Sequence, residues 1–239
     1  THGRRNSVVV PWFIWNDIDS RTMGVWVSEL PPITRAAERY KEVQVLGRAG
    51  TLILKQGDNV HEGYVKNCKI TVRADADFQT LLEWLTGDGQ VIFSNEPDKA
   101  YTAHIAAEVR FDRKGNTLKT ATVPFYVHPH KAQYPPESDI ALNTSGSLYN
   151  PGSVSSRPIL TLTLTGTATV EIGGNSMTFT SVINTQETIT VDCDAETIMK
   201  NGEIWGGTYD GDFFQLAPGT NTITLTDCTA VVTPRWRWV

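Results

Sequence analysis

Tyr149-Asn150-Pro151-Gly152-Ser153-Val154-Ser155-Ser156-Arg157-Pro158 separates two dissimilar parts of the sequence. Its two prolines and its glycine exclude a helix and a central strand. Before the stretch the sequence is mixed and contains one helical pattern; after it, short alternating Thr-rich segments dominate. Turn-forming residues extend this seam back to Pro129, and strand alternation resumes at Ile159. We therefore expect two modules, residues 1–136 and residues 137–239.

The charges differ between the two modules. The chain of 239 residues has a formal net charge of -5. Residues 1–136 carry 17 Lys and Arg against 15 Asp and Glu, a net charge of +2, whereas residues 137–239 carry 4 against 11, a net charge of -7. Neither module has a polybasic patch, so specific nucleic-acid binding is not expected. No apolar run approaches the ~20 residues of a membrane span, so membrane insertion is not expected either.

The first module is predicted to be an α+β, β-sandwich-like fold with one helix. Residues 76–86 place Phe78, Leu81, Leu82 and Leu85 at i, i+3, i+4 and i+7, which predicts one buried helical face. Asp75 or Asp77 is expected to cap its N-terminus, and Gly87 to occupy C′. Strands with β-branched and aromatic residues surround the helix, at residues 8–15, 24–30, 41–46, 51–54, 64–72, 91–94, 101–111 and 118–127. In the strand at 64–72, Val65 and Ile70 are expected to lie in the core.

The second module is predicted to be a β-sandwich of about a hundred residues. Leu160, Leu162 and Leu164 alternate with threonines, as in a strand with one buried face. Residues 167–180 are predicted to be a hairpin turning at Gly173-Gly174, and Asn201-Gly202 is a type I′ turn signal. The fold class is therefore mainly β throughout.

No motif predicts catalysis, a metal or a cofactor. GxSxG, P-loop and HExxH sequences do not occur. Cys68, Cys193 and Cys228 lack CxxC spacing, so buried free thiols are expected rather than disulfides or zinc. His128-Pro129-His130 is expected to be a loop at the seam, and Asp192-Cys193-Asp194 a charged strand end rather than a calcium loop.

The order of short motifs resembles the distal tail proteins of long-tailed phages, of the short two-domain kind. Phe214 stands where that family often has Pro. The resemblance covers nearly the whole chain, and its motifs are Asp19-Ser20, Gly24-Val25, Leu30-Pro31, Glu38-Arg39, Gly47-Arg48-Ala49-Gly50, Glu83-Trp84-Leu85, Ile92-Phe93-Ser94, Glu96-Pro97, Tyr101, Asn150-Pro151-Gly152, Pro158, Val191-Asp192-Cys193, Gly211-Asp212-Phe213, Leu216-Ala217-Pro218-Gly219-Thr220-Asn221 and Thr233-Pro234-Arg235.

The resemblance implies a structural virion protein made in the host cytoplasm and located at the distal end of the phage tail. In that family the first module forms a homo-hexameric ring between the tail tube protein and the tail-tip hub, through which DNA passes. The second module is galectin-like and projects outward. The family supplies no catalytic residues and no cofactor. Arg35, Arg39 and Arg48, beside turns in the family-like segment, are the candidates for the ring interface.

Two other functions compete with this interpretation. The second module could bind host cell-wall carbohydrate, with Trp205 as the sugar-contact candidate because indole rings stack on sugars. A cell-wall glycosidase is the third hypothesis, although the two carboxylates of such an enzyme cannot be identified from spacing. Trp236 and Trp238 share one strand face, which is more typical of a core or an interface than of a sugar platform.

Overall fold

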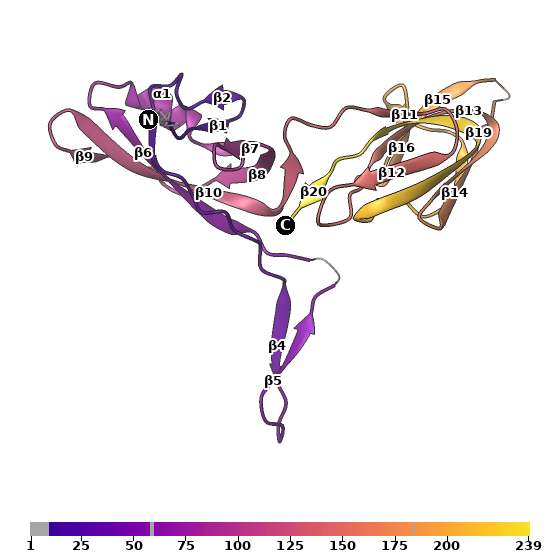
Figure 1. Ribbon diagram of the computed structural model, residues 1–239, viewed down its shortest axis with the longest axis horizontal. Coiled ribbons are helices and arrows are strands. Elements are labelled where there is room, and N and C mark those ends of the chain that lie inside the picture. Colours follow the sequence, from indigo (N-terminus) through magenta and orange to yellow (C-terminus); the bar gives the residue numbers. More distant parts are fainter. Residues whose placement is uncertain (1–9, 58–59, 184) are drawn as a thin grey trace, which may run out of the picture. The chain divides into compact units, whose positions relative to one another are not determined.

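The computed structural model describes residues 10–57, 60–183 and 185–239. The chain is mainly β, as expected, and separates into two compact units (Figure 1). One unit runs up to Lys131 and includes Val239; the other is Ala132–Trp238. The independent folding of residues 1–136 and 137–239 stays a prediction. In the described residues, no helix is long and apolar enough to cross a membrane.

The first unit is built on one curled antiparallel sheet with the strand order β2-β1-β7-β8-β10-β6-β3. Its side chains enclose a core in which Trp15, Phe93 and Phe125 are fully buried. The rings of Trp15 and Phe93 each pack edge to face against the ring of Phe125. The strands are β1 (Phe13–Trp15), β2 (Ile18–Asp19), β3 (Trp26–Glu29), β6 (Tyr64–Arg73), β7 (Gly87–Phe93), β8 (Lys99–Ile105), β9 (Asp112–Lys114) and β10 (Leu118–Gln133).

Helix α1 (Phe78–Trp84) covers part of this core. Asp77 caps it, accepting hydrogen bonds from the amides of Gln79 and Thr80 at 3.1 and 3.2 Å. Leu81 and Leu85 are buried as predicted, but the expected burial of Leu82 is wrong, since 41% of it is exposed. Leu81 and Leu85 face the sheet, and Phe78, also expected to be buried, is half-buried against the same core. Leu82, one position further round than Leu81, faces solvent.

Two tryptophans fix the orientation of α1. The Trp15 indole donates to the Trp84 carbonyl at 3.0 Å, and the Trp84 indole donates back to the Trp15 carbonyl at 3.2 Å. The Trp84 ring stacks on Phe13 with 5.6 Å between centroids. Because these contacts place Trp84 against the sheet, the helix cannot also turn Leu82 inward. The last residue of the helix therefore joins the core in place of the predicted leucine.

A separate two-stranded sheet leaves the first unit between β3 and β6. It consists of β4 (Tyr40–Gln44) and β5 (Thr51–Lys55), paired from Tyr40↔Lys55 to Gln44↔Thr51. The two predicted strands around Gly47-Arg48-Ala49-Gly50 are thus confirmed. Figure 1 shows this hairpin extending away from the sheet that carries β6 and β10.

The second unit is a second curled sheet with the order β11-β19-β13-β15-β16-β17, in which β12 pairs with β19, β14 with β13, and β18 with β14. The long strands β13 and β19 form its centre, and a register shift between Leu164 and Thr169 bends their pairing. The strands of this sheet are β11 (Ile140–Leu142), β12 (Gly146–Asn150), β13 (Ile159–Ile172), β14 (Asn175–Thr180), β15 (Glu187–Asp192), β16 (Thr197–Lys200), β17 (Glu203–Ile204), β18 (Thr208–Gly211) and β19 (Gly219–Thr233). The short strand β20 (Arg237–Trp238) also belongs to this unit but lies outside this sheet.

The turn signals of the second unit are confirmed. The 167–180 hairpin turns at Gly173 and Gly174, whose φ angles are 59° and 88°. Asn201 and Gly202 have φ angles of 52° and 84° and join β16 to β17. Positive φ at both central residues is what a type I′ turn requires.

The stretch Tyr149–Pro158 is a folded loop of the second unit, not a linker. Asn150 is buried, and its side-chain amide donates to the carbonyls of Val154 and Leu216 at 3.2 and 2.8 Å. Its Oδ1 accepts the Gly152 amide at 2.7 Å. β10 continues through Pro129 to Gln133, so these residues form a strand, and the division between the two compact units falls after Lys131. A proline is tolerated there as the strand passes its last ladder partner in β6, at Val127.

Candidate functional site

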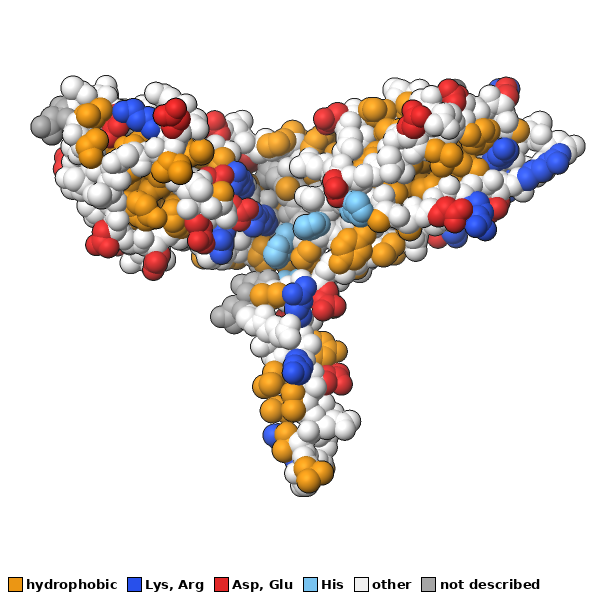
Figure 2. Space-filling model, turned by 180° about the vertical axis from the view of Figure 1, so that it is seen from behind, with side chains coloured by type: hydrophobic (Ala, Val, Ile, Leu, Met, Phe, Trp, Pro, Cys, Tyr) orange, Lys and Arg blue, Asp and Glu red, His pale blue; other side chains and the backbone are white. Residues whose placement is uncertain are grey.

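The hairpin of β4 and β5, residues 40–55, is the most exposed apolar element of the first unit; we call it the hairpin arm. Leu46 at its tip is fully exposed, and 60% of Ile53 and 46% of Leu54 are accessible to solvent. Figure 2 shows hydrophobic side chains along the whole projecting arm. Several exposed apolar side chains gathered on one projecting element mark an interaction site.

The arm is amphipathic, because its register gives each face a different character. Val43 and Leu52 are direct cross-strand partners, and Leu54 lies on the same face opposite Lys41. The other face carries Glu42 opposite Ile53. A two-stranded hairpin alone is marginally stable in water. We therefore expect another surface to cover the apolar face of the arm when the protein is assembled.

The root of the arm is tied to the first unit by backbone bonds. The amide of Arg39 donates to the Val60 carbonyl at 2.9 Å, and the amide of Glu62 donates to the Ala37 carbonyl at 2.9 Å. Glu38 and His61 form an isolated bridge. The arm is therefore held at its base while its tip contacts nothing else in the described part of the chain.

A buried charged cluster anchors the segment that leads into the arm. Lys66 donates to the Pro32 carbonyl at 2.7 Å, and its Nζ lies 4.0 Å from Glu96 and 4.8 Å from the Tyr101 ring centroid. Lys131 pairs with Glu96 at 2.8 Å. Glu96 also accepts a hydrogen bond from the Tyr101 hydroxyl. The cluster joins β6, β8 and β10 to the segment at Pro32.

Burial explains the unusual acid–base behaviour of this cluster. Desolvation lowers the pKa of Lys66 to about 8, an effect that Glu96 opposes and Lys131 reinforces. Desolvation also raises the pKa of Tyr64 to about 12, and it raises the pKa of Tyr101 as well. The charged groups of this cluster are paired with one another and with the Pro32 carbonyl, so the cluster holds the strands and the segment at Pro32 together.

The three ring-interface candidates are spread along the segment that carries the arm. Arg48 lies in the exposed tip, whereas Arg39 lies at the root, 3.6 Å from Glu62 in an exposed ion pair. Arg35 is exposed before the root. The structure does not gather them into one patch, and their role in a ring stays a prediction.

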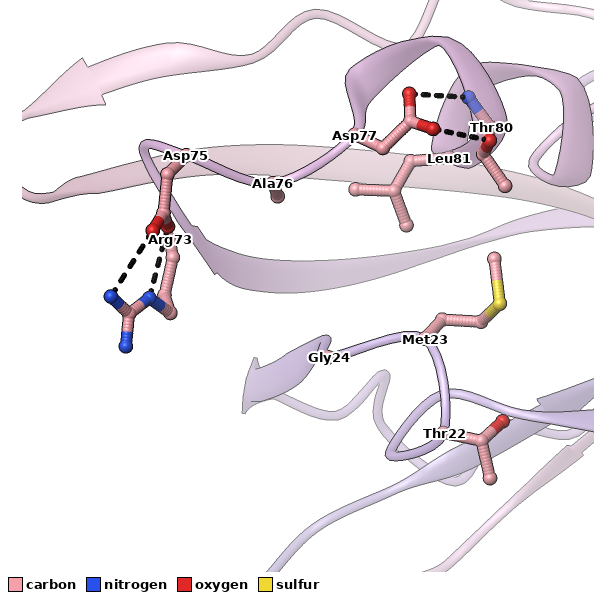
Figure 3. Close-up of a pocket in the computed structure, with 9 residues that line it drawn as sticks. All are labelled: Thr22, Met23, Gly24, Arg73, Asp75, Ala76, Asp77, Thr80 and Leu81. Atoms are coloured by element: carbon pink, nitrogen blue, oxygen red, sulfur yellow. Dashed lines mark hydrogen bonds and ion pairs between the residues drawn. The ribbon is translucent and has the colours of Figure 1, made fainter.

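A pocket of about 300 Å³ lies near the N-terminus of α1, and Figure 3 shows its lining. The side chains of Met23 and Leu81 point toward one another from opposite walls. The rim is polar: Arg73 pairs with Asp75 at 2.9 Å, and Asp77 accepts the Thr80 hydroxyl at 2.7 Å. The hydrogen bond from Thr80 holds the pKa of Asp77 below its usual range, so this carboxylate is charged at neutral pH.

The outer face of the sheet carries a smaller apolar pair. Val65, expected in the core, is 52% exposed and lies directly opposite Tyr126, which is 49% exposed. The alternation of β6 puts Cys68 and Ile70 inside and therefore turns Val65 outward. The expectation for Ile70 is confirmed, and that for Val65 is wrong.

Trp205 occupies a core position in the second unit. It is 6% exposed, its ring lies 6.3 Å from that of Phe179, and its indole donates to Glu187 at 3.2 Å. Glu187 also pairs with Lys200 at 2.7 Å. In this position neither ring face is open for stacking on a sugar. Trp236 is likewise buried and Trp238 packs against the same core, as their shared face indicated.

The histidines and the aspartate that were candidate metal ligands lie in strands. In the described residues no group of three or more His, Cys, Asp or Glu could hold a metal ion. The expected loop at His128-Pro129-His130 is wrong, because these residues belong to β10. Asp192 ends β15 and accepts hydrogen bonds from the two terminal guanidinium nitrogens of Arg235 at 2.8 and 2.9 Å.

The cysteines are free, as expected. Cys68 and Cys193 are buried, and burial raises the pKa of their thiols to about 12 and about 11. Cys228 is half-buried, and burial raises its pKa as well. Thiols in such surroundings remain protonated and are poor nucleophiles.

The comparisons with known proteins point to phage tails. Residues 151–238 match the family model of the siphovirus-type tail component, C-terminal domain. The crystal structure of Dit from phage SPP1, described as a paradigm of the hub adsorption apparatus in phages that infect Gram-positive bacteria, shares the fold with a TM-score of 0.74. The match has 16% sequence identity and covers 96% of this chain and 100% of that chain. No curated protein sequence matches significantly.

Proposed function

We propose that this chain, a Dit-like distal tail protein by its motifs, its C-terminal family match and its fold, forms a homo-hexameric ring at the distal end of a phage tail. The ring connects the tail tube protein to the tail-tip hub. The function is structural, since the family match and the structural neighbour are tail proteins rather than enzymes.

The hairpin arm is the observation that supports the ring most strongly. Its root is fixed by backbone bonds, while Val43, Leu52 and Leu54 present an apolar face that nothing else in the described chain covers. Burying such apolar surface lowers the free energy by about 25 cal/mol per Å². A neighbouring copy supplies the same cover to every arm in turn, which is how a head-to-tail contact closes a ring.

The net charges of residues 1–136 and 137–239 support different positions of these two parts in the ring. Residues 1–136 carry a net charge of +2, with both signs present in similar numbers for pairing between copies. Residues 137–239 carry -7, so copies of the galectin-like part repel one another and are favoured at the outside of a ring. A ring wall without a net basic stripe lets DNA pass without holding it.

Labelling of intact tails tests the proposal. Antibodies raised against the purified chain and coupled to gold should bind at the distal end of the tail, opposite the capsid. Antibody first saturated with the purified chain is the matched control and should leave the tails unlabelled. Specific label along the tube, at the capsid or on no part of the particle would contradict the proposed location.

A further inference from the structure

We propose that Leu46, at the tip of the hairpin arm of one copy, inserts into the pocket between Met23 and Leu81 of the next copy. The proposal rests on the ring proposed above and names the contact that joins its subunits. Each copy then contributes the arm on one side and the pocket on the other.

The tip has the form of an apolar knob. Leu46 is fully exposed, and Gly47 and Gly50, with φ angles of 80° and 82°, turn the chain tightly behind it. Residues 45–50 contain one charged side chain, Arg48. The tip therefore presents one aliphatic side chain beside one cation.

The pocket has the matching chemistry. Met23 and Leu81 give it apolar walls, and methionine adapts to the shape of an incoming side chain. Its volume of about 300 Å³ lies at the lower end for small-molecule sites, which suits a single inserted side chain. The lining carries Arg73, Asp75 and Asp77, a net charge of -1, and Arg73 is already paired with Asp75. Asp77 therefore offers a carboxylate to Arg48.

The position of the two features favours a contact between copies. The arm joins the sheet just before Tyr64, the first residue of β6, whereas the pocket includes Arg73, its last residue. Ten residues of strand place these points about 30 Å apart. In Figure 1 the arm extends away from the sheet, so its tip moves further from the pocket of its own chain. A knob and a hole on different faces make a head-to-tail contact, which can close into a ring.

Cysteine cross-linking in assembled tails tests this contact. One chain carries Leu46→Cys, and a second, differently tagged chain carries Thr80→Cys or Thr22→Cys on the pocket rim. Tails assembled from the mixture are oxidised and run on a non-reducing gel. A disulfide between the two tags requires two copies and Cα atoms within about 7 Å. A chain with Glu42→Cys and Ile53→Cys, which are direct cross-strand partners on the other face of the arm, is the positive control for oxidation.

We expect a disulfide-linked dimer that carries both tags with at least one of the two rim cysteines. When a single chain carries both the tip cysteine and a rim cysteine, we expect a ladder of cross-linked species up to the hexamer. Leu46→Cys paired with Thr122→Cys, on the outer sheet face, should give at least tenfold less dimer. Tails that contain the chain and pass the oxidation control, but yield no tip–rim dimer, overturn the contact and leave the ring standing. Tails that lack the wild-type chain overturn the proposed function as well.

Discussion

Gly152 and Arg237 approach so closely that a Cβ on the glycine would lie 2.2 Å from the arginine's carbonyl oxygen. The same oxygen accepts the Ser153 amide at 3.1 Å. The loop that follows Asn150 is thereby closed against the last strand of the chain. The stretch that marked a change of composition is one of the places where the second unit is held together.

We predict that Gly152→Ala destabilises the protein by about 1–3 kcal/mol or more, because a methyl group cannot fit beside the Arg237 carbonyl without a backbone shift. Denaturant unfolding monitored by tryptophan fluorescence measures the loss. Gly206→Ala is the matched control, since nothing lies within 4 Å of its added Cβ. It should change stability by no more than about 0.5 kcal/mol. Equal effects of the two substitutions would refute the close approach.

The two leucines of α1 should respond differently to truncation. Leu81→Ala removes a side chain that is 2% exposed and should cost about 2–5 kcal/mol in free energy of unfolding. Leu82→Ala removes one that is 41% exposed and should cost less than about 1 kcal/mol. Urea denaturation of both variants gives the comparison. A larger loss for Leu82→Ala would mean that the helix presents its other face to the sheet.

Stability should rise with pH between about 8 and 10 because of Lys66. Its pKa is about 8 in the folded protein and about 10.4 in an unfolded chain, so in this range the unfolded state binds more protons. One such proton gives a slope of up to ~1.4 kcal/mol per pH unit. Above pH 10 the raised pKa of Tyr64 opposes the trend, since its folded form keeps a proton that the unfolded form loses.

Lys66→Met is the control for this pH dependence, because it keeps an unbranched side chain that is only one atom shorter and removes the titrating group. Urea unfolding at pH 8, 9 and 10 should then show a slope reduced by most of the wild-type value. An unchanged slope would assign the effect to another group.

The hairpin arm should matter for assembly and not for folding. Leu52→Ser with Leu54→Ser makes the apolar face of the arm polar, but neither side chain packs in the core of the first unit. The melting temperature of the isolated chain should therefore change by less than about 3 °C. Incorporation into tails, measured by quantitative immunoblotting, should fall at least tenfold. Thr51→Ser, on the opposite face, should incorporate normally. A folded double variant that assembles like the wild type would contradict the role of the arm.

Local sequence signals predicted much of the fold. Asn201-Gly202 and Gly173-Gly174 require positive φ at both turn positions, so their hairpins could be predicted from two residues each. Leu160, Leu162 and Leu164 alternate without interruption, and all three are buried. The ordered family motifs, such as Gly47-Arg48-Ala49-Gly50, predicted a resemblance to distal tail proteins; residues 151–238 match the siphovirus-type tail component model, and the chain shares the fold of SPP1 Dit.

The wrong burial predictions concern residues whose orientation is set by contacts between segments far apart in the sequence. Leu82 fits a helical stripe, but the paired indoles of Trp15 and Trp84 set which face of α1 meets the sheet. Val65 is apolar, yet its strand face is fixed by the burial of its neighbours. No local signal distinguishes strands that pack on a core from strands that project, so the sequence predicted β4 and β5 without indicating that they form an exposed arm.

A reconstruction of the assembled tail tip decides whether this chain forms the ring. It should show one sixfold layer of this chain between the tail tube and the hub, with the first unit of each copy forming the ring and its hairpin arm reaching the next copy. Density for this chain elsewhere in the particle, or in a layer without sixfold symmetry, would contradict it.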